Sequence, residues 1–196
     1  GDASLTKIII QTFKKFPEFN KSVKIFLYEK SNLLKNIQKK KIKNKKVKWI
    51  KHFNSIKKGP VIFFGNEFFD AIPVKQFTVN NDKFLEKYFI VNKKGLIETY
   101  QKALPADISF LKSFDILKNQ NFIEYPKLGL IELEKVVNKI KSLSGGVLLI
   151  DYGYLKPFNG NTLQAVMKNK KVNIKKLYNY IGKVDITNLV NFNLLK

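Results

Sequence analysis

Residues 61–77 read VIFFGNEFFDAIPVKQF and place two carboxylates, those of Glu67 and Asp70, directly after a short apolar run. The run VIFF follows Gly59-Pro60 and ends at Gly65, so it has the length and the boundaries of a buried strand. Burying a carboxylate costs free energy unless it has a partner. The stretch therefore predicts a strand that ends at a functional edge of a sheet.

Similar apolar runs alternate with helical patterns along the rest of the chain. The helical patterns cover residues 4–16, 31–40 and 129–143, and the expected core strands cover residues 23–29, 47–50, 60–65 and 147–154. Strands that are joined by helices favour right-handed crossovers and a mostly parallel sheet. Residues 74–101 differ, because their three alternating runs are separated by turn residues. The sequence predicts an α/β fold with an antiparallel, β-rich insertion at about 74–101.

Three of the apolar runs in the expected strands are followed by acidic residues. Glu29, Glu67 and Asp151 each follow an apolar run. The carboxyl ends of parallel strands meet at one edge of a sheet, where ligands of doubly wound folds bind. Acidic residues also cap the helices that follow strands, so a capping role stays open for each of them.

The composition limits the class of protein. The chain has 196 residues, of which 44% are hydrophobic, and its apolar runs fall short of the roughly 20 residues of a membrane span. It has no cysteine, one histidine and no signal-peptide pattern, so we expect a cytoplasmic location and no metal site. The net charge of +22 comes from lysine without any arginine, which favours biased genome composition over a nucleic-acid surface.

Three motifs give the chain a family resemblance. GNEFFDAIPVKQF, GGVLLIDYGY and NTLQAVMKNKKV, the last followed by DIT at 185–187, resemble in order and spacing the MidA family of S-adenosylmethionine-dependent methyltransferases. The resemblance covers nearly the whole chain and implies a Rossmann-like class I methyltransferase sheet. It also implies a link to respiratory complex I, because the family's mitochondrial members act in assembly of that complex, in the matrix.

The resemblance assigns residues to S-adenosyl-L-methionine. Glu29 falls on the acidic position that binds the ribose hydroxyls, which a carboxylate can accept. Gly1 falls on the second glycine of the family's glycine-rich loop, and Ala3 falls on the third. Asn66 is expected at the amino-acid end of the cofactor. Trp49 or Ile50 is expected against adenine, with a core position as the open alternative for Trp49.

The resemblance also implies that the sequence is a fragment. The family's central first strand would precede Gly1, and the family continues beyond residue 196. We therefore expect residues 1–196 to be a single methyltransferase domain that is truncated at both ends and inactive by itself.

The implied reaction is N-methylation of arginine in a protein substrate, a complex I subunit in the family's mitochondrial members. Glu67 and Asp70 would hold the guanidinium cation through charge-assisted hydrogen bonds. Phe69, Asp151 and Tyr152 would contact the substrate, although core packing stays open for Phe69. A noncatalytic assembly protein or nucleic-acid-binding protein that keeps the fold is the alternative function.

Overall fold

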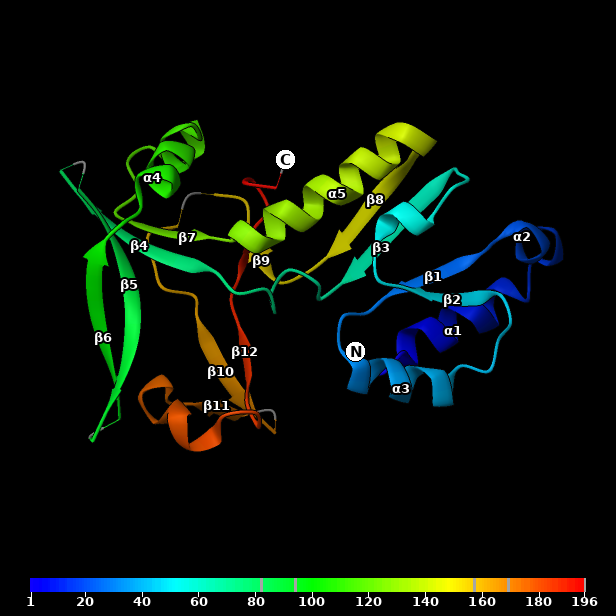
Figure 1. Ribbon diagram of the computed structural model, residues 1–196, viewed down its shortest axis with the longest axis horizontal. Helices are drawn as coiled ribbons and strands as arrows, with labels where there is room; N and C mark the ends of the chain where they lie inside the picture. The colour runs from blue at the N-terminus through cyan, green and yellow to red at the C-terminus, as the bar shows by residue number, and fades with distance from the viewer. Residues whose placement is uncertain (82, 94, 157, 169, 196) are drawn as a thin grey trace. The chain divides into compact units, whose positions relative to one another are not determined.

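The computed structural model describes residues 1–81, 83–93, 95–156, 158–168 and 170–195 (Figure 1). The chain divides into two compact units, residues 1–60 and residues 61–196. Within the described ranges, none of the helices has both the length and the apolar character needed to cross a membrane.

The first unit contains one parallel pair of strands with helices beside it. Its elements are α1 (Ser4–Phe13), α2 (Pro17–Ser22), β1 (Ile25–Tyr28), α3 (Asn32–Lys41), β2 (Val47–Ile50) and the short 3-10 helix η1 (Phe53–Ser55). β1 and β2 pair in parallel, with Ile25 opposite Val47. Buried Ile10 and Ile42 pack with Val47 to form a small core. The two strands and the α3 crossover between them are confirmed.

The first helix is shorter than the sequence pattern predicted. The apolar spacing predicted one helix over residues 4–16, whereas α1 ends at Phe13 and α2 starts at Pro17. Proline suits the first turn of a helix, since the missing N–H has no helical partner there. Ser31 caps α3 as expected, because its hydroxyl oxygen accepts the N–H of Leu34 at 3.3 Å.

Ala3 precedes α1 in a left-handed backbone conformation. Its φ is 67°, in the region that glycine adopts without steric strain. This is the residue that falls on the third glycine of the family's loop. The backbone therefore has the geometry of a glycine position although the residue carries a Cβ atom.

Replacing Ala3 with glycine in the full-length protein should raise the free energy of unfolding by about 0.5 kcal/mol. Relief of the left-handed strain contributes about 1 kcal/mol, and the greater freedom of glycine in the unfolded chain offsets part of it. Urea unfolding measures the difference. The matched control is Ala106→Gly on the exposed surface of helix α4 (Pro105–Lys112), which should lower stability by a similar amount. A loss of stability in both variants would contradict the strain at Ala3.

A second parallel pair opens the unit of residues 61–196. β3 (Val61–Asn66) pairs with β8 (Gly145–Ile150), from Val61 opposite Gly145 to Asn66 opposite Ile150. Helix α5 (Lys127–Leu143) lies along this pair (Figure 1). Its buried residues are Gly129, Glu132 and Val136.

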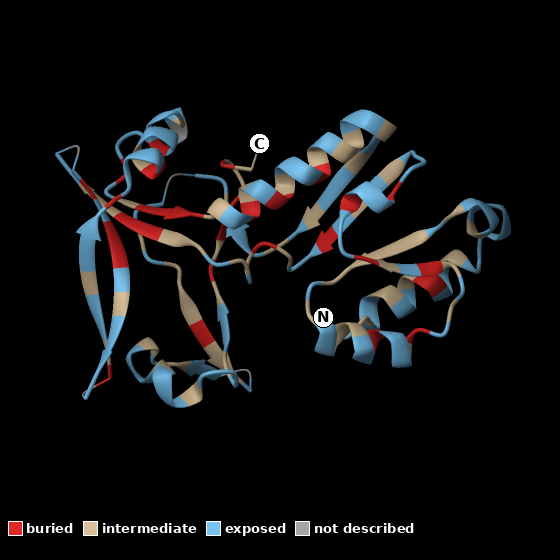
Figure 2. Ribbon diagram, in the orientation of Figure 1, coloured by how far each residue is buried: buried red, intermediate tan, exposed pale blue. Residues whose placement is uncertain are grey.

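The prediction that these strands are buried is wrong for one face and holds only in part for the other, where Gly65 is buried and Val61, Phe63 and Leu149 are half-buried. Figure 2 shows much of β8 as exposed, and Ile62, Phe64, Leu148 and Ile150 are exposed at the surface. Side chains alternate between the two faces of a strand, so the face that packs on α5 and the opposite face differ in burial. The expected central strand stays a prediction.

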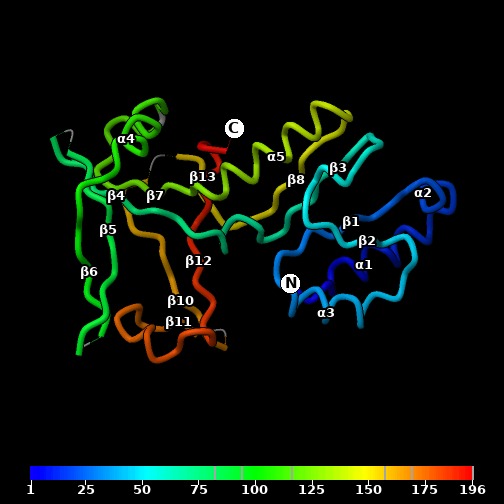
Figure 3. Tube along the Cα trace, viewed as in Figure 1, coloured from blue at the N-terminus to red at the C-terminus, as the bar shows by residue number. Residues whose placement is uncertain are grey.

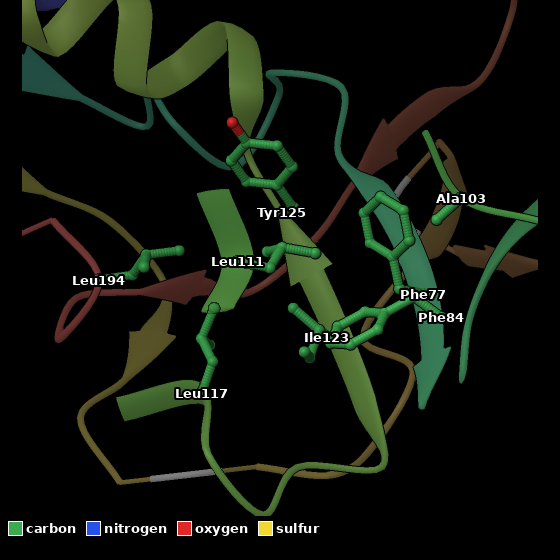
Figure 4. Packing of buried hydrophobic residues seen from close by; sticks show 8 residues of the cluster. All are labelled: Phe77, Phe84, Ala103, Leu111, Leu117, Ile123, Tyr125 and Leu194. Carbon is green, nitrogen blue, oxygen red and sulfur yellow. The ribbon is translucent and has the colours of Figure 1, made fainter. Parts of the chain in front are cut away.

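The antiparallel insertion is confirmed and is larger than predicted. β4 (Lys75–Asn80), β5 (Lys83–Asn92) and β6 (Gly95–Lys102) form consecutive hairpins, and β7 (Phe122–Tyr125) adds a fourth strand beside β4. Asp82 and Lys94, which fall in the predicted turns, lie outside the described residues. The main core of the unit packs against this sheet (Figure 4), through Phe77, Phe84, Ala103, Leu111, Leu117, Ile123, Tyr125 and Leu194.

The C-terminal third brings two of the sequence motifs together. It contains β9 (Gly153–Tyr154), β10 (Gln164–Met167), β11 (Lys170–Val172), η3 (Ile174–Tyr180), β12 (Asp185–Thr187) and β13 (Val190–Asn191). Earlier in the chain, the short 3-10 helix η2 (Asp115–Leu117) precedes β7. β10 pairs with both β11 and β12, so Gln164 of the NTLQAV motif lies opposite Thr187 of the DIT motif (Figure 3). β13 then pairs in parallel with β9. The fold is therefore α/β with both parallel and antiparallel strands.

Candidate functional site

Gln38 joins three of the residues that were expected to hold the cofactor. Its Nε2 donates to Oε2 of Glu29 at 2.9 Å and to the backbone carbonyl oxygen of Gly1 at 2.8 Å. Its Oε1 accepts the indole N–H of Trp49 at 2.9 Å. We call Gly1, Glu29, Gln38 and Trp49 the Gln38 cluster. It gathers residues from the start of the chain, the end of β1, helix α3 and strand β2.

The carboxylate of Glu29 is held from two sides. Its Oε1 accepts the backbone N–H of Ser31 at 2.8 Å, while its Oε2 accepts from Gln38. The side chain is 16% exposed. An ionised carboxylate offers about four lone-pair sites, so each oxygen can accept one further donor. Glu29 can therefore bind two hydroxyl groups without losing the contacts that orient it.

Glu67 is the residue that directly follows strand β3. Its backbone N–H donates to the carbonyl oxygen of Ile150 at 2.8 Å, which extends the pairing of β3 with β8 by one residue. Its φ is 47°, in the left-handed region that residues with a Cβ avoid. Strain of this kind costs on the order of 1 kcal/mol or more and is concentrated at functional sites. The sheet thus presents an exposed, strained glutamate at its carboxyl edge.

Asp151 shapes the loop that follows Glu67. It comes directly after β8, and its Oδ2 accepts the backbone N–H groups of Phe69 at 2.8 Å and of Asp70 at 3.3 Å. Its Oδ1 accepts the N–H of Tyr152 at 2.9 Å. We call residues 67–70 the acidic loop. Asp151 ties this loop to the end of the neighbouring strand, so the expected shared edge of Glu67 and Asp151 is confirmed.

The negative charges around Asp70 favour the binding of a cation. Burial raises the pKa of its carboxyl above the ordinary value, and the negative charges of Asp151 and Glu67 raise the pKa further. A hydrogen bond from the backbone of Ala71 acts in the opposite direction. A positive group bound here would reduce the repulsion among the three carboxylates. Within the part of the chain that the structure describes, no group of three or more His, Cys, Asp or Glu residues could hold a metal ion.

The remaining predicted residues lie at the same edge and differ in exposure. Asn66 ends β3 and is exposed, as is Tyr152. The ring of Phe69 is only 2% exposed, and a Cβ atom on Gly129 of α5 would lie 3.1 Å from it. The glycine therefore allows Phe69 to pack closely on the helix. A contact between Phe69 and a substrate stays a prediction.

A second, partly buried hydrogen-bond network is joined to the acidic loop. Glu124 of β7 accepts both the backbone N–H and the hydroxyl of Thr162. The Thr162 hydroxyl oxygen accepts the backbone N–H of Leu189 at 2.9 Å. The adjacent residue, Asn188, donates its backbone N–H to the carbonyl oxygen of Asp70 at 3.0 Å. The two C-terminal motifs are thus connected to the loop that carries the acidic pair.

Among the residues of these networks that were not predicted as site residues are Gln38, Glu124 and Asn188. A signal for Gln38 was present, because Leu34, Gln38 and Ile42 are four residues apart and share one face of the helical pattern. A glutamine between apolar residues on such a face needs a buried partner. Glu124 and Asn188 depend on contacts between distant segments, which local patterns do not contain.

A family model matches the chain over its whole length. The model describes a "Putative S-adenosyl-L-methionine-dependent methyltransferase" and covers residues 1–196. Two similar curated proteins are the mitochondrial protein arginine methyltransferase NDUFAF7 homolog of Caenorhabditis elegans, 27% identical, and the mitochondrial protein arginine methyltransferase NDUFAF7 of Xenopus tropicalis, 20% identical. Each match covers 100% of this chain and 50% of the relative. The chain spans about half the length of these relatives.

Two solved structures from Burkholderia thailandensis share the fold. One is a COG1565 superfamily member, described as a likely methyl transferase bound to S-adenosyl-homocysteine, with a TM-score of 0.67 over 88% of this chain and 46% of that chain. The other is a native structure of a COG1565 superfamily protein, with a TM-score of 0.68 over 88% of this chain and 48% of that chain. Each of the two is 18% identical to this chain in sequence. Because the family model extends from residue 1 to residue 196, this chain belongs to the MidA-like family of methyltransferases that use S-adenosyl-L-methionine.

Proposed function

We propose that the full-length protein methylates the guanidinium group of an arginine in a protein substrate. The observation that carries the proposal is the acidic loop, in which Glu67 is held in a strained conformation three residues before Asp70. Asp151 fixes the backbone of this loop through two N–H groups. The charges of Glu67 and Asp151 act on Asp70, and such a group of carboxylates suits an organic cation that donates N–H groups.

The Gln38 cluster has the donor and acceptor groups that S-adenosyl-L-methionine requires. Glu29 keeps acceptor capacity for the two ribose hydroxyls after its bonds to Ser31 and Gln38. The indole N–H of Trp49 is already bonded, so its ring face is the part that would meet adenine. Gly1 would contribute backbone to the loop beside the cofactor, and Asn66 would meet the amino-acid end. When bound, the cofactor supplies an electrophilic methyl group on a sulfonium.

The acidic pair would orient the nucleophile. The carboxylates of Glu67 and Asp70 accept N–H groups from two nitrogens of the guanidinium, which leaves the third free to react. As that nitrogen takes the methyl group, the sulfur would keep the electron pair of the broken S–CH3 bond, so that S-adenosylhomocysteine would leave as a neutral thioether. A guanidinium proton that is hydrogen-bonded to Glu67 would then pass to this carboxylate and from it to water. Asp151 keeps the loop in register during this step, and Tyr152 lines the side of the site that faces the protein substrate. Positioning of this kind is the main requirement of a displacement reaction.

We further propose that the substrate is a subunit of respiratory complex I or of a related complex. This follows the resemblance to the mitochondrial family members, and the two named arginine methyltransferases support a protein substrate. The expected location is the cytoplasm, or the mitochondrial matrix for eukaryotic members. Residues 1–196 by themselves are expected to be inactive.

A methyl-transfer assay with the full-length protein tests the proposal. The protein is incubated with S-adenosylmethionine that carries a labelled methyl group and with matched peptides that contain arginine or lysine at one position. We expect label on the arginine peptide only, recovered as methylarginine after hydrolysis. Residues 1–196 contain no arginine, so this part of the enzyme cannot contribute methylarginine of its own.

Two results would overturn the proposed function. Label on the lysine peptide would refute the choice of nucleophile. Binding of RNA without any affinity for S-adenosylmethionine would favour the noncatalytic alternative.

A further inference from the structure

Gln38 is a buried polar residue on a helix that is otherwise rich in lysine. It is 5% exposed, although its neighbours Lys39 and Lys40 are exposed. A buried side-chain amide is retained without penalty only when its donors and its acceptor are all paired. The role of Gln38 therefore depends on what it bonds.

The three hydrogen bonds of the Gln38 amide all join it to residues of the proposed cofactor site. Its two donor bonds go to Glu29 and to the carbonyl oxygen of Gly1, and its oxygen accepts from Trp49. The three partners come from separate segments of the chain. A single side chain thus sets the position of the ribose-binding carboxylate relative to the backbone loop and to the indole ring.

The chemistry of an amide suits this position better than that of other side chains. A glutamate at residue 38 would place a second carboxylate against Glu29 and remove the donor that orients it. A methionine would fill a similar volume but would leave the N–H of Trp49 and the carboxylate of Glu29 without this partner. Only a group with two donors and one acceptor pairs all three.

We propose that Gln38 is a positioning residue for S-adenosyl-L-methionine, which acts by fixing the carboxylate of Glu29 to receive the ribose hydroxyls. The proposal rests on the proposed function for the identity of the ligand. It adds a residue that does not touch the cofactor and that determines how well Glu29 can bind it. The consequence is that the effect of Gln38 on affinity depends on the hydroxyl groups.

Calorimetry on the full-length protein tests this dependence with two ligands. One is S-adenosylhomocysteine, which binds without turnover, and the other is its analogue without the 2′ and 3′ hydroxyls. The Gln38→Met variant should bind S-adenosylhomocysteine about 10-fold more weakly and should bind the dideoxy analogue within about twofold of the unmodified protein. In a Glu29→Ala background, Gln38→Met should add less than about a twofold loss. Gln11→Met, at an exposed glutamine of α1, is the matched control and should change neither affinity.

A second variant covers the case in which Gln38→Met does not fold. Gln38→Glu keeps the shape and the acceptor for Trp49, and it should also lose affinity for S-adenosylhomocysteine but not for the dideoxy analogue. Equal losses for the two ligands, or a full additional loss in the Glu29→Ala background, would show that Gln38 does not act through the ribose-binding carboxylate and would overturn the proposal. The unmodified protein separates the two proposals: absence of S-adenosylhomocysteine binding overturns both, whereas binding with a hydroxyl-independent loss overturns only the role of Gln38.

Discussion

Replacement of Glu67 by glutamine in the full-length protein should lower the rate of methyl transfer by about 100-fold or more, while the affinity for S-adenosylmethionine stays within about twofold. Loss of one group that is directed at charge in a transition state commonly costs a factor of this size. The substitution keeps the shape of the side chain and removes its negative charge and its ability to take a proton. Because Glu67 is assigned to the guanidinium and not to the cofactor, the substitution should lower the transfer rate without lowering the affinity for the cofactor.

Single-turnover rates and calorimetry on the same protein provide the measurement. Glu134→Gln, at an exposed glutamate of α5, is the matched control and should leave both quantities unchanged. If the variant loses cofactor affinity as much as it loses rate, Glu67 belongs to the cofactor site and the assignment is wrong. An unchanged rate would remove Glu67 from the reaction.

Replacement of Glu29 by alanine should have the opposite pattern. The dissociation constant for S-adenosylmethionine should rise by about 10- to 150-fold, which corresponds to the roughly 1.5 to 3 kcal/mol of a hydrogen bond to a charged group. At saturating cofactor the transfer rate should stay within about threefold of the unmodified protein, because the acidic loop is intact. A titration of rate against cofactor concentration measures both the affinity for the cofactor and the rate at saturating cofactor.

Glu18→Ala is the matched control for Glu29. Glu18 is an exposed glutamate of α2 in the same unit, where it pairs with Lys21 at 2.8 Å on the surface. Surface pairs of this kind contribute little, so the control should leave the dissociation constant unchanged. Equal affinities for the Glu29 variant and the unmodified protein would place the ribose elsewhere.

The positions of the acidic residues could be predicted because they depend on local signals. The run before Glu67 and the run before Asp151 each have the composition of a core strand, and strands joined by helices are parallel. The observed register, with Asn66 opposite Ile150, brings the residues that follow these strands to one edge. The pattern of apolar residues was sufficient for this part of the site.

The supporting contacts could not be predicted because they join segments that are distant in sequence. The bond from the Phe69 N–H to Asp151 spans 82 residues, and that from Leu189 to Thr162 spans 27. Asp151 was expected to line a cleft, whereas the structure shows its carboxylate accepting backbone N–H groups. Gln38 is the exception, since its place on an apolar helix face could have been noticed from the sequence.

The backbone at Glu67 has a consequence for laboratory evolution of this protein. At a φ of 47°, asparagine and glycine have less steric strain than glutamate. A library at this position that is sorted by thermal stability should therefore become enriched in those two residues. Both would discard the carboxylate that we propose binds the substrate. A screen that reports only folding would therefore select against catalysis at position 67, as is common where an active site is strained. Selection for stability in this family should hold that position fixed.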